Sequence, residues 1–228
     1  MHPSMHRNER GSFVYYTCDR LPVRHAFTTK FGGVSRGDCE SLNLGFNRGD
    51  ERENVLENYR ILAEQLGMNE GRITMTKQIH DTQISVVTEG EAGMGLHQPM
   101  AWESDAIVTA LPETPLCGFY ADCVVTLFYD PATRTAGVAH AGWRGMAAGI
   151  LPKTVEVMAE KLGAKRESLI AVLGPSIRQE CFETDADVPE AMERLMGGRV
   201  HPFIAEKGVK FHVDPQGIGV RLLTDAGL

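Results

Sequence analysis

Two apolar runs around a proline-containing turn are the feature that most constrains the fold of this chain. Residues 124–129 and 135–139 are rich in Val, Thr, Phe and Tyr, and they flank the sequence Asp-Pro-Ala-Thr. Proline suits the second position of a tight turn because its ring fixes φ near −65°. The pattern therefore predicts an antiparallel β-hairpin.

The register of this hairpin would bring a thiol and an imidazole together. A turn centred between Pro131 and Ala132 places Cys123 opposite His140. Directly opposed residues have Cβ atoms roughly 4.5–5.5 Å apart, and a one-residue slip would separate the pair. The two side chains could share a metal, act as nucleophile and base, or be a buried thiol beside a structural histidine.

A third residue decides among these readings. Residues 72–87 are expected to form a strand, in which alternation puts Gln78 and His80 on one face and Lys77 on the other. If His80 converges with Cys123 and His140, the three match a catalytic zinc site, which keeps its fourth position for water.

Several local signals place the remaining elements. Residues 1–12 are polar and expected to fray, residues 30–47 form a loop dense in Gly and Asn, and Asp50 is expected to cap the helix that follows. A helix over 145–162 should kink or split at Pro152.

Further helices are expected over 187–196 and from Pro215, with Asp214 as cap. Strands and helices are interspersed without strict alternation. We therefore expect a single domain over 1–228, with a mixed α/β fold in which sheets are layered as a sandwich with flanking helices.

Composition limits the partners. The chain has 228 residues and a net charge of −7, with no Lys/Arg-rich run, so neither nucleic acid nor an anionic membrane surface is expected. No apolar stretch approaches the ~20 residues that span a bilayer. Five widely spaced cysteines indicate a reducing compartment, and we expect the cytoplasm. Composition does not predict the oligomeric state.

The segment after the hairpin has anion-binding character. The sequence Ala-Gly-Trp-Arg-Gly over 141–145 leads from a strand into a helix N-terminus, where free N–H groups favour an anion. Arg144 adds a planar fork suited to phosphate or carboxylate.

These motifs together resemble the YfiH-type family, whose members are variously called laccase-domain proteins, polyphenol oxidases, multifunctional purine nucleoside phosphorylases and peptidoglycan editing factors. The resemblance runs from about Ala26 to the last residues. It is carried by FTTKFGGVS (27–35), SLNLGFNRGD (41–50), TKQIH (76–80), SDAIVT (104–109), ADC (121–123), HAGWRG (140–145), LGPSI (173–177) and CFE (181–183).

The resemblance implies a layered mixed α/β sandwich and a set of site residues. The family's metal ligands map onto His80, Cys123 and His140. Its ligand pocket maps onto Asn43, Asn47, Lys77, Gln78 and Arg144, and onto Lys30, where the family usually has arginine. The family also continues some tens of residues past Leu228, so this chain is expected to lack the family's C-terminal segment.

The implied activity is that of a zinc-dependent purine nucleoside enzyme. It would cleave adenosine, inosine and methylthioadenosine with phosphate, giving free base and ribose 1-phosphate, and would also deaminate adenosine. A zinc-bound water has a pKa near 7, as such deamination requires. The alternatives are a cysteine hydrolase or amidase acting on peptidoglycan precursors, with Cys123 as nucleophile and His140 as base, and a copper-dependent polyphenol oxidase (laccase).

Overall fold

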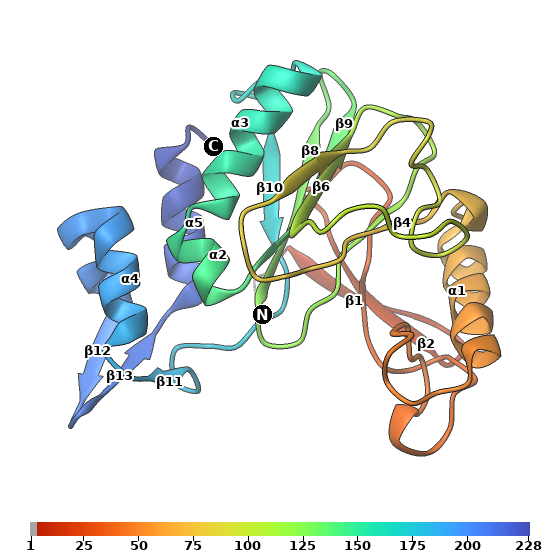
Figure 1. The fold of residues 1–228 in the computed structure, drawn as a ribbon, viewed down its shortest axis with the longest axis horizontal. Coiled ribbons are helices and arrows are strands. Elements are labelled where there is room, and N and C mark those ends of the chain that lie inside the picture. Colours follow the sequence, from red (N-terminus) through yellow and green to blue (C-terminus); the bar gives the residue numbers. More distant parts are fainter. Residues whose placement is uncertain (1–3) are drawn as a thin grey trace.

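A five-stranded sheet forms the centre of the molecule (Figure 1). The structure is a computed structural model, and it describes residues 4–228. The strands lie in the order β10-β8-β9-β6-β5, and only the β5–β6 pair is parallel. Their bounds are Ile84–Val86 (β5), Ala106–Thr109 (β6), Val124–Asp130 (β8), Thr135–Ala141 (β9) and Ile170–Leu173 (β10).

The predicted hairpin exists as β8 and β9, but its predicted register is wrong. Val125, not Cys123, lies opposite His140. The turn closes one residue later than expected, because the Asp130 carbonyl accepts the N–H of Arg134, which takes a left-handed φ of 59°. The register therefore shifts by two positions. A shift of two preserves the face, so Cys123 and His140 still project to the same side of the sheet.

Helices cover one face of this sheet. α3 (Ile150–Leu162) packs on β9 and β6, and α5 (Pro215–Asp225) packs on β10 and β8. The predicted helix over 145–162 is split, but at Gly149 and not at Pro152 as predicted: α2 (Trp143–Ala147) ends before Gly149, whose φ is 82°. Pro152 then lies in the first turn of α3, where its missing N–H has no intrahelical partner to lose.

The other face of the sheet packs against a second, smaller β-layer through Val125, Val138 and Phe27. This layer holds an antiparallel sheet and a parallel strand pair, with α1 (Arg52–Leu66) beside them (Figure 1). The sheet strands are Met5–Arg10 (β1), Phe13–Cys18 (β2) and Phe27–Thr28 (β3), and the parallel pair is Thr74–Met75 (β4) and Leu116–Cys117 (β7).

Three local expectations are wrong in this layer. Residues 5–10 do not fray but pair along their whole length with apolar β2; residues 1–3 lie outside the described part. Residues 72–87 form no continuous strand, because the chain between β4 and β5 is a loop. Asp50 is not the cap of α1: Glu51 takes that position, and Asp50 accepts the N–H of Glu51 instead.

The C-terminal part adds a small sheet and the expected helices. α4 (Asp187–Met196) has the predicted bounds, and the Asp214 carboxylate accepts the N–H of Gly217 at 3.0 Å as the cap of α5. The small sheet consists of Glu183–Thr184 (β11), Ile204–Lys207 (β12) and Lys210–Val213 (β13). Elsewhere in the chain, short 3₁₀ helices span Gly37–Cys39, Glu70–Arg72 and Gly197–Phe203. The predicted mixed α/β layering is confirmed, and no helix within residues 4–228 has both the length and the apolar character to cross a bilayer.

Candidate metal centre

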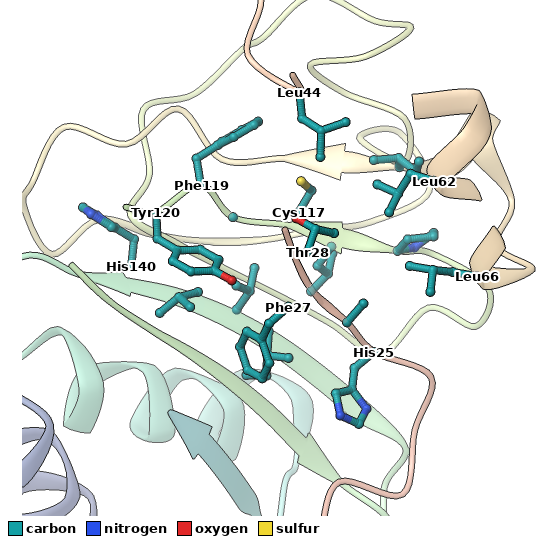
Figure 2. A pocket seen from close by; sticks show the side chains of 18 of the residues that line it. His25, Phe27, Thr28, Leu44, Leu62, Leu66, Cys117, Phe119, Tyr120 and His140 are labelled. Carbon is teal, nitrogen blue, oxygen red and sulfur yellow. The ribbon is translucent and has the colours of Figure 1, made fainter. Parts of the chain in front are cut away.

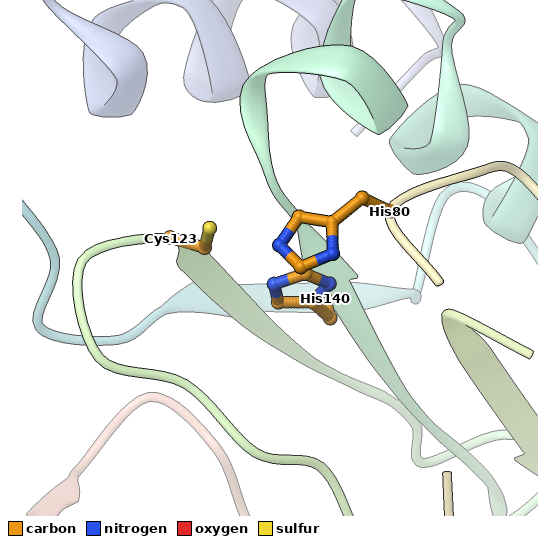
Figure 3. A group of neighbouring side chains, drawn as sticks. All are labelled: His80, Cys123 and His140. Carbon is orange, nitrogen blue, oxygen red and sulfur yellow. The ribbon is translucent and has the colours of Figure 1, made fainter. Parts of the chain in front are cut away.

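Three potential metal ligands meet at one end of the central hairpin (Figure 3). One ligand atom each from His80, Cys123 and His140 lies within 4.8 Å of the others. His80 comes from the β4–β5 loop, Cys123 directly precedes β8, and His140 lies on β9. The two imidazole rings meet edge to face, with centroids 4.7 Å apart. The convergence expected from the sequence is present, although the strand expected to carry His80 is a loop.

Asp105 joins two of the three candidate ligands, His80 and His140. Its carboxylate is fully buried and accepts the backbone N–H groups of Ile79, His80 and Asp81 at 3.0–3.1 Å. These bonds hold His80 at a left-handed φ of 61°, a conformation that costs a non-glycine residue of order 1 kcal/mol.

The same carboxylate fixes the tautomer of His140. Asp105 Oδ1 lies 2.9 Å from His140 Nδ1, and because a carboxylate can only accept, Nδ1–H is the donor. Nε2 of His140 is thereby left free as a ligand. Sequence reasoning did not assign Asp105 a role; the available signal was a lone acidic residue directly before the wholly buried strand β6.

Burial sets the protonation of the cluster. It lowers the pKa of His140 below its ordinary value; the hydrogen bond that His140 donates to Asp105 opposes this effect, and the nearby His80 adds to it. Burial also raises the pKa of the Cys123 thiol, and the charges of Asp122 and Asp105 raise it further. The imidazole of His140 is therefore neutral at neutral pH, and a cation bound here would have to displace the proton of the Cys123 thiol.

Gly142 keeps the space between the ligands open. A Cβ atom at this position would lie 2.8 Å from His80 Cδ2 and 3.2 Å from Cys123 Sγ. His140 is almost wholly buried, whereas the His80 side chain is exposed, so the cluster opens toward solvent on one side. Two imidazoles and a thiol with an open side form a donor set that fits zinc or copper, with room for a further ligand.

A cavity of about 770 Å³ adjoins the cluster and includes all three candidate ligands in its lining. It lies between the central hairpin and the second β-layer with α1 (Figure 2). Apolar side chains dominate its walls, including Phe27, Leu62, Phe119 and Tyr120. The volume and the mostly apolar lining are those of a small-molecule site.

The predicted substrate contacts divide into two groups. Lys30, Asn43 and Gln78 line the cavity, whereas Asn47, Lys77 and Arg144, also within the described part of the chain, lie outside its lining.

The last two have other neighbours. Lys77 pairs with Glu103 at 2.8 Å, and the Arg144 guanidinium lies 4.1 Å from the centre of the Trp143 ring, beside a shallow depression between α2 and α4.

Asn43 is largely committed to its own loop. Its side-chain amide donates to the Gly45 carbonyl and the Asp50 carboxylate and accepts the Gly45 N–H. Hydrogen bonds from Ser35, Asn43 and Asn54 hold the pKa of Asp50 at about 2. This network shapes the wall of the cavity that the Gly- and Asn-rich loop supplies.

The charged side chains lining the cavity are mostly cationic. Arg24, Lys30 and Arg48 contribute positive charge and Asp122 is the one carboxylate in the lining. The Arg48 guanidinium is exposed and has no hydrogen-bond partner within residues 4–228. An anion is therefore favoured here although the whole chain carries −7. Sequence reasoning missed Arg48; the signal was a basic residue at the end of the Asn-rich loop.

Comparison with known proteins identifies relatives of this arrangement. The family model described as multi-copper polyphenol oxidoreductase laccase matches residues 24–228. A purine nucleoside phosphorylase of Deinococcus radiodurans is 38% identical over 208 residues, covering 91% of this chain and 77% of that protein. The purine nucleoside phosphorylase YlmD of Bacillus subtilis is 32% identical, covering 89% of this chain and 73% of its own.

Solved structures share the fold. The crystal structure of YlmD from Geobacillus stearothermophilus matches with a TM-score of 0.87 at 28% identity, covering 97% of this chain and 84% of that one. The hypothetical protein YfiH of Bacillus licheniformis matches with a TM-score of 0.86 at 27% identity, covering 96% of this chain and 83% of its own.

Proposed function

Because the chain belongs to the family described as multi-copper polyphenol oxidoreductase laccase, we propose that it is a metal-dependent enzyme, and specifically a purine nucleoside phosphorylase. The observation that carries this proposal is a two-histidine, one-cysteine cluster opening into a cavity with a cationic rim. Curated relatives named purine nucleoside phosphorylase support it. The reactants would be a purine nucleoside and phosphate.

His80, Cys123 and His140 would hold the metal, which we propose to be zinc; the same donors also suit copper. A zinc ion held there would supply a Lewis acid and acidify a bound water. Asp105 would hold His140 in the tautomer that presents Nε2.

The cationic rim would bind phosphate. Arg48 and Lys30, which line the cavity, are the first candidates, and Arg144 and Lys77 remain proposed contacts from outside its lining. In phosphorolysis a phosphate oxygen attacks C1′ of the ribose, the bond to the purine nitrogen breaks, and the leaving purine takes up a proton. The positive charges of Arg48 and Lys30 would attract the phosphate anion into the cavity.

The purine would bind among the aromatic and amide side chains. Phe119 and Tyr120 offer flat apolar surface, and Gln78 and Asn43 are the proposed polar contacts in the lining, with Asn47 from outside it. Burial raises the pKa of Tyr120 to about 12, so its phenol stays a hydrogen-bond donor at neutral pH. Adenosine deamination is proposed as a second activity, since sites with His and Cys ligands serve this reaction elsewhere.

Two alternatives fit the site less well. A cysteine hydrolase needs a thiol with a lowered pKa, whereas burial raises that of Cys123, and no hydrogen bond joins it to His140 within residues 4–228. Laccase chemistry calls for several coppers, whereas the described residues hold a single cluster of three candidate ligands.

The proposed cellular location is the cytoplasm. The five free cysteines support this location.

The proposal is tested by incubating the zinc-loaded protein with adenosine, inosine or methylthioadenosine, with and without phosphate. Chromatography should find free base and ribose 1-phosphate only when phosphate is present, and inosine from adenosine in both cases. Inosine alone would leave deamination without phosphorolysis. If neither free base nor inosine forms, the proposed function is wrong.

A further inference from the structure

The side chain of Gln78 is bonded to the backbone of a distant segment. Its Nε2 donates to the Phe119 carbonyl at 2.7 Å, and its Oε1 accepts the Phe119 N–H at 2.7 Å. The Thr76 hydroxyl also donates to Oε1 at 2.7 Å. Three of the four hydrogen bonds that this amide can make are therefore used within the protein.

These bonds continue a short strand pair beyond its end. β4 and β7 pair only at Thr74–Leu116 and Met75–Cys117, and the last backbone bond runs from the Thr76 N–H to the Cys117 carbonyl at 3.1 Å. Past this point the side-chain amide of Gln78 replaces the backbone hydrogen bonds of a strand, because it bonds both the N–H and the carbonyl of Phe119. The loop that carries His80 is thus joined to the segment that leads into Cys123.

The His80 loop needs such support because packing does not provide it. Ile79 is 42% exposed, the His80 side chain is also exposed, and His80 has a left-handed backbone. Asp105 joins this loop to His140, because its carboxylate accepts three backbone N–H groups of the loop and also the Nδ1–H of His140. Gln78 provides the corresponding connection toward Cys123, which Asp105 does not contact by a hydrogen bond.

We propose that Gln78 is a positioning residue that pre-forms the metal site by holding the His80 loop against the segment leading to Cys123. This inference rests on the metal site of the proposed function and does not depend on the substrate. Loss of the Gln78 bonds should let His80 and Cys123 separate in the metal-free protein. Mutation of residues that orient metal ligands typically lowers metal affinity about 10–100-fold.

The test measures zinc binding to the full chain in the absence of nucleoside. Gln78→Ala removes the amide, and Gln78→Met removes its hydrogen bonds while retaining most of its volume. Gln83→Ala is the matched control: Gln83 lies in the same loop, its side chain is exposed, and it makes no side-chain hydrogen bond within residues 4–228. The zinc dissociation constant is measured by competition with a chromophoric chelator, and thermal unfolding of the metal-free proteins is followed in parallel.

We expect both Gln78 variants to raise the zinc dissociation constant at least 10-fold, and Gln83→Ala to change it less than twofold. The Gln78→Met variant should remain folded at the assay temperature, so that weaker binding reports the site and not the fold. Unchanged zinc affinity in folded Gln78→Met overturns the inference. So does an increase in the Michaelis constant for nucleoside with unchanged zinc affinity, because Gln78 would then act only as the substrate contact proposed above and not on the metal site.

Discussion

Asp105 lies with its Oδ1 atom 2.9 Å from Nδ1 of His140, and the same carboxylate accepts the three consecutive N–H groups of residues 79–81. One buried side chain thus fixes the tautomer of one candidate ligand and the backbone of another. Without this carboxylate, the exposed His80 would lose the bonds that fix its backbone, and the neutral ring of His140 would lose the partner that defines its tautomer.

Asp105→Asn should therefore weaken metal binding and the fold together. The amide oxygen can replace one acceptor, but the NH₂ group meets N–H donors and leaves them unpaired. We expect the zinc dissociation constant to rise about 10–100-fold and the free energy of unfolding of the metal-free protein to fall by about 1–3 kcal/mol. Chelator competition and urea unfolding measure these changes. Wild-type values for both would show that the carboxylate does not organise the site.

Removal of any one candidate ligand should abolish stoichiometric zinc binding. His80→Ala, Cys123→Ala and His140→Ala each leave two protein donors, too few for a stable site. Elemental analysis after purification with zinc should find about one zinc per wild-type chain and nearly none in each variant. If one variant retains full zinc, that residue is not a ligand.

The meeting of Cys123 and His140 could be predicted from the sequence because side chains in a strand alternate between two faces, and a register error of two residues does not change the face. The hairpin register was wrong, yet Cys123 and His140 remain on one face because the shift is even. His80 was assigned to a strand, whereas Asp105 holds it in a loop. A carboxylate that binds three N–H groups from a segment more than 20 residues earlier leaves no periodic signal, so local pattern could not predict it.

The residues that line the cavity were less predictable because the lining depends on tertiary packing. Arg144 follows the candidate ligand His140 closely in sequence, yet its guanidinium stacks on Trp143 outside the cavity lining. Arg48, far from the hairpin in sequence, lines the cavity because the Asn-rich loop folds over it. Cation–π stacking and loop placement are decided by neighbours that sequence spacing does not reveal.

Gly142→Ala should block metal binding without disturbing the backbone. Gly142 has φ −63° and ψ 161°, a conformation that alanine adopts readily, so the added methyl acts only by its position 2.8 Å from His80 Cδ2. We expect at least a 10-fold rise in the zinc dissociation constant with little change in the urea unfolding midpoint. Gly90→Ala is the control, since a Cβ there meets no atom within 4 Å. Equal zinc affinity in the two variants would contradict the packing argument.

Asp130 should make the stability of the hairpin depend on pH. Burial alone would raise the pKa of this carboxyl, but hydrogen bonds from Ser168, Thr133, Lys165 and Ala132 outweigh it and hold the pKa well below the ordinary value. Its stabilising contribution is therefore fully present well above the unfolded pKa of about 3.9, begins to decline near about pH 5, and is lost as pH falls through the lowered pKa of the folded state.

Asp130→Asn should remove this contribution. We expect it to lower the free energy of unfolding by about 1–3 kcal/mol at pH 7 and to flatten the pH dependence between about pH 5 and 2 relative to wild type. Urea unfolding at a series of pH values measures both effects. Parallel wild-type and variant curves across this range would show that another carboxylate carries the acid sensitivity.

Arg48→Ala should weaken phosphate binding and leave the metal in place. The Arg48 guanidinium lines the cavity and has no hydrogen-bond partner within residues 4–228, so it is free to bind an anion. A charged hydrogen bond is worth about 1.5–3 kcal/mol, which corresponds to a rise of about 10- to 100-fold in the Michaelis constant for phosphate. The turnover number should change little if Arg48 binds phosphate equally in the ground and transition states.

Steady-state kinetics at varied phosphate concentration measure this change. Arg36→Ala is the control, because Arg36 is exposed on the same loop but lies outside the cavity lining. An unchanged Michaelis constant in a zinc-loaded, active Arg48→Ala protein would place the phosphate site elsewhere in the cavity.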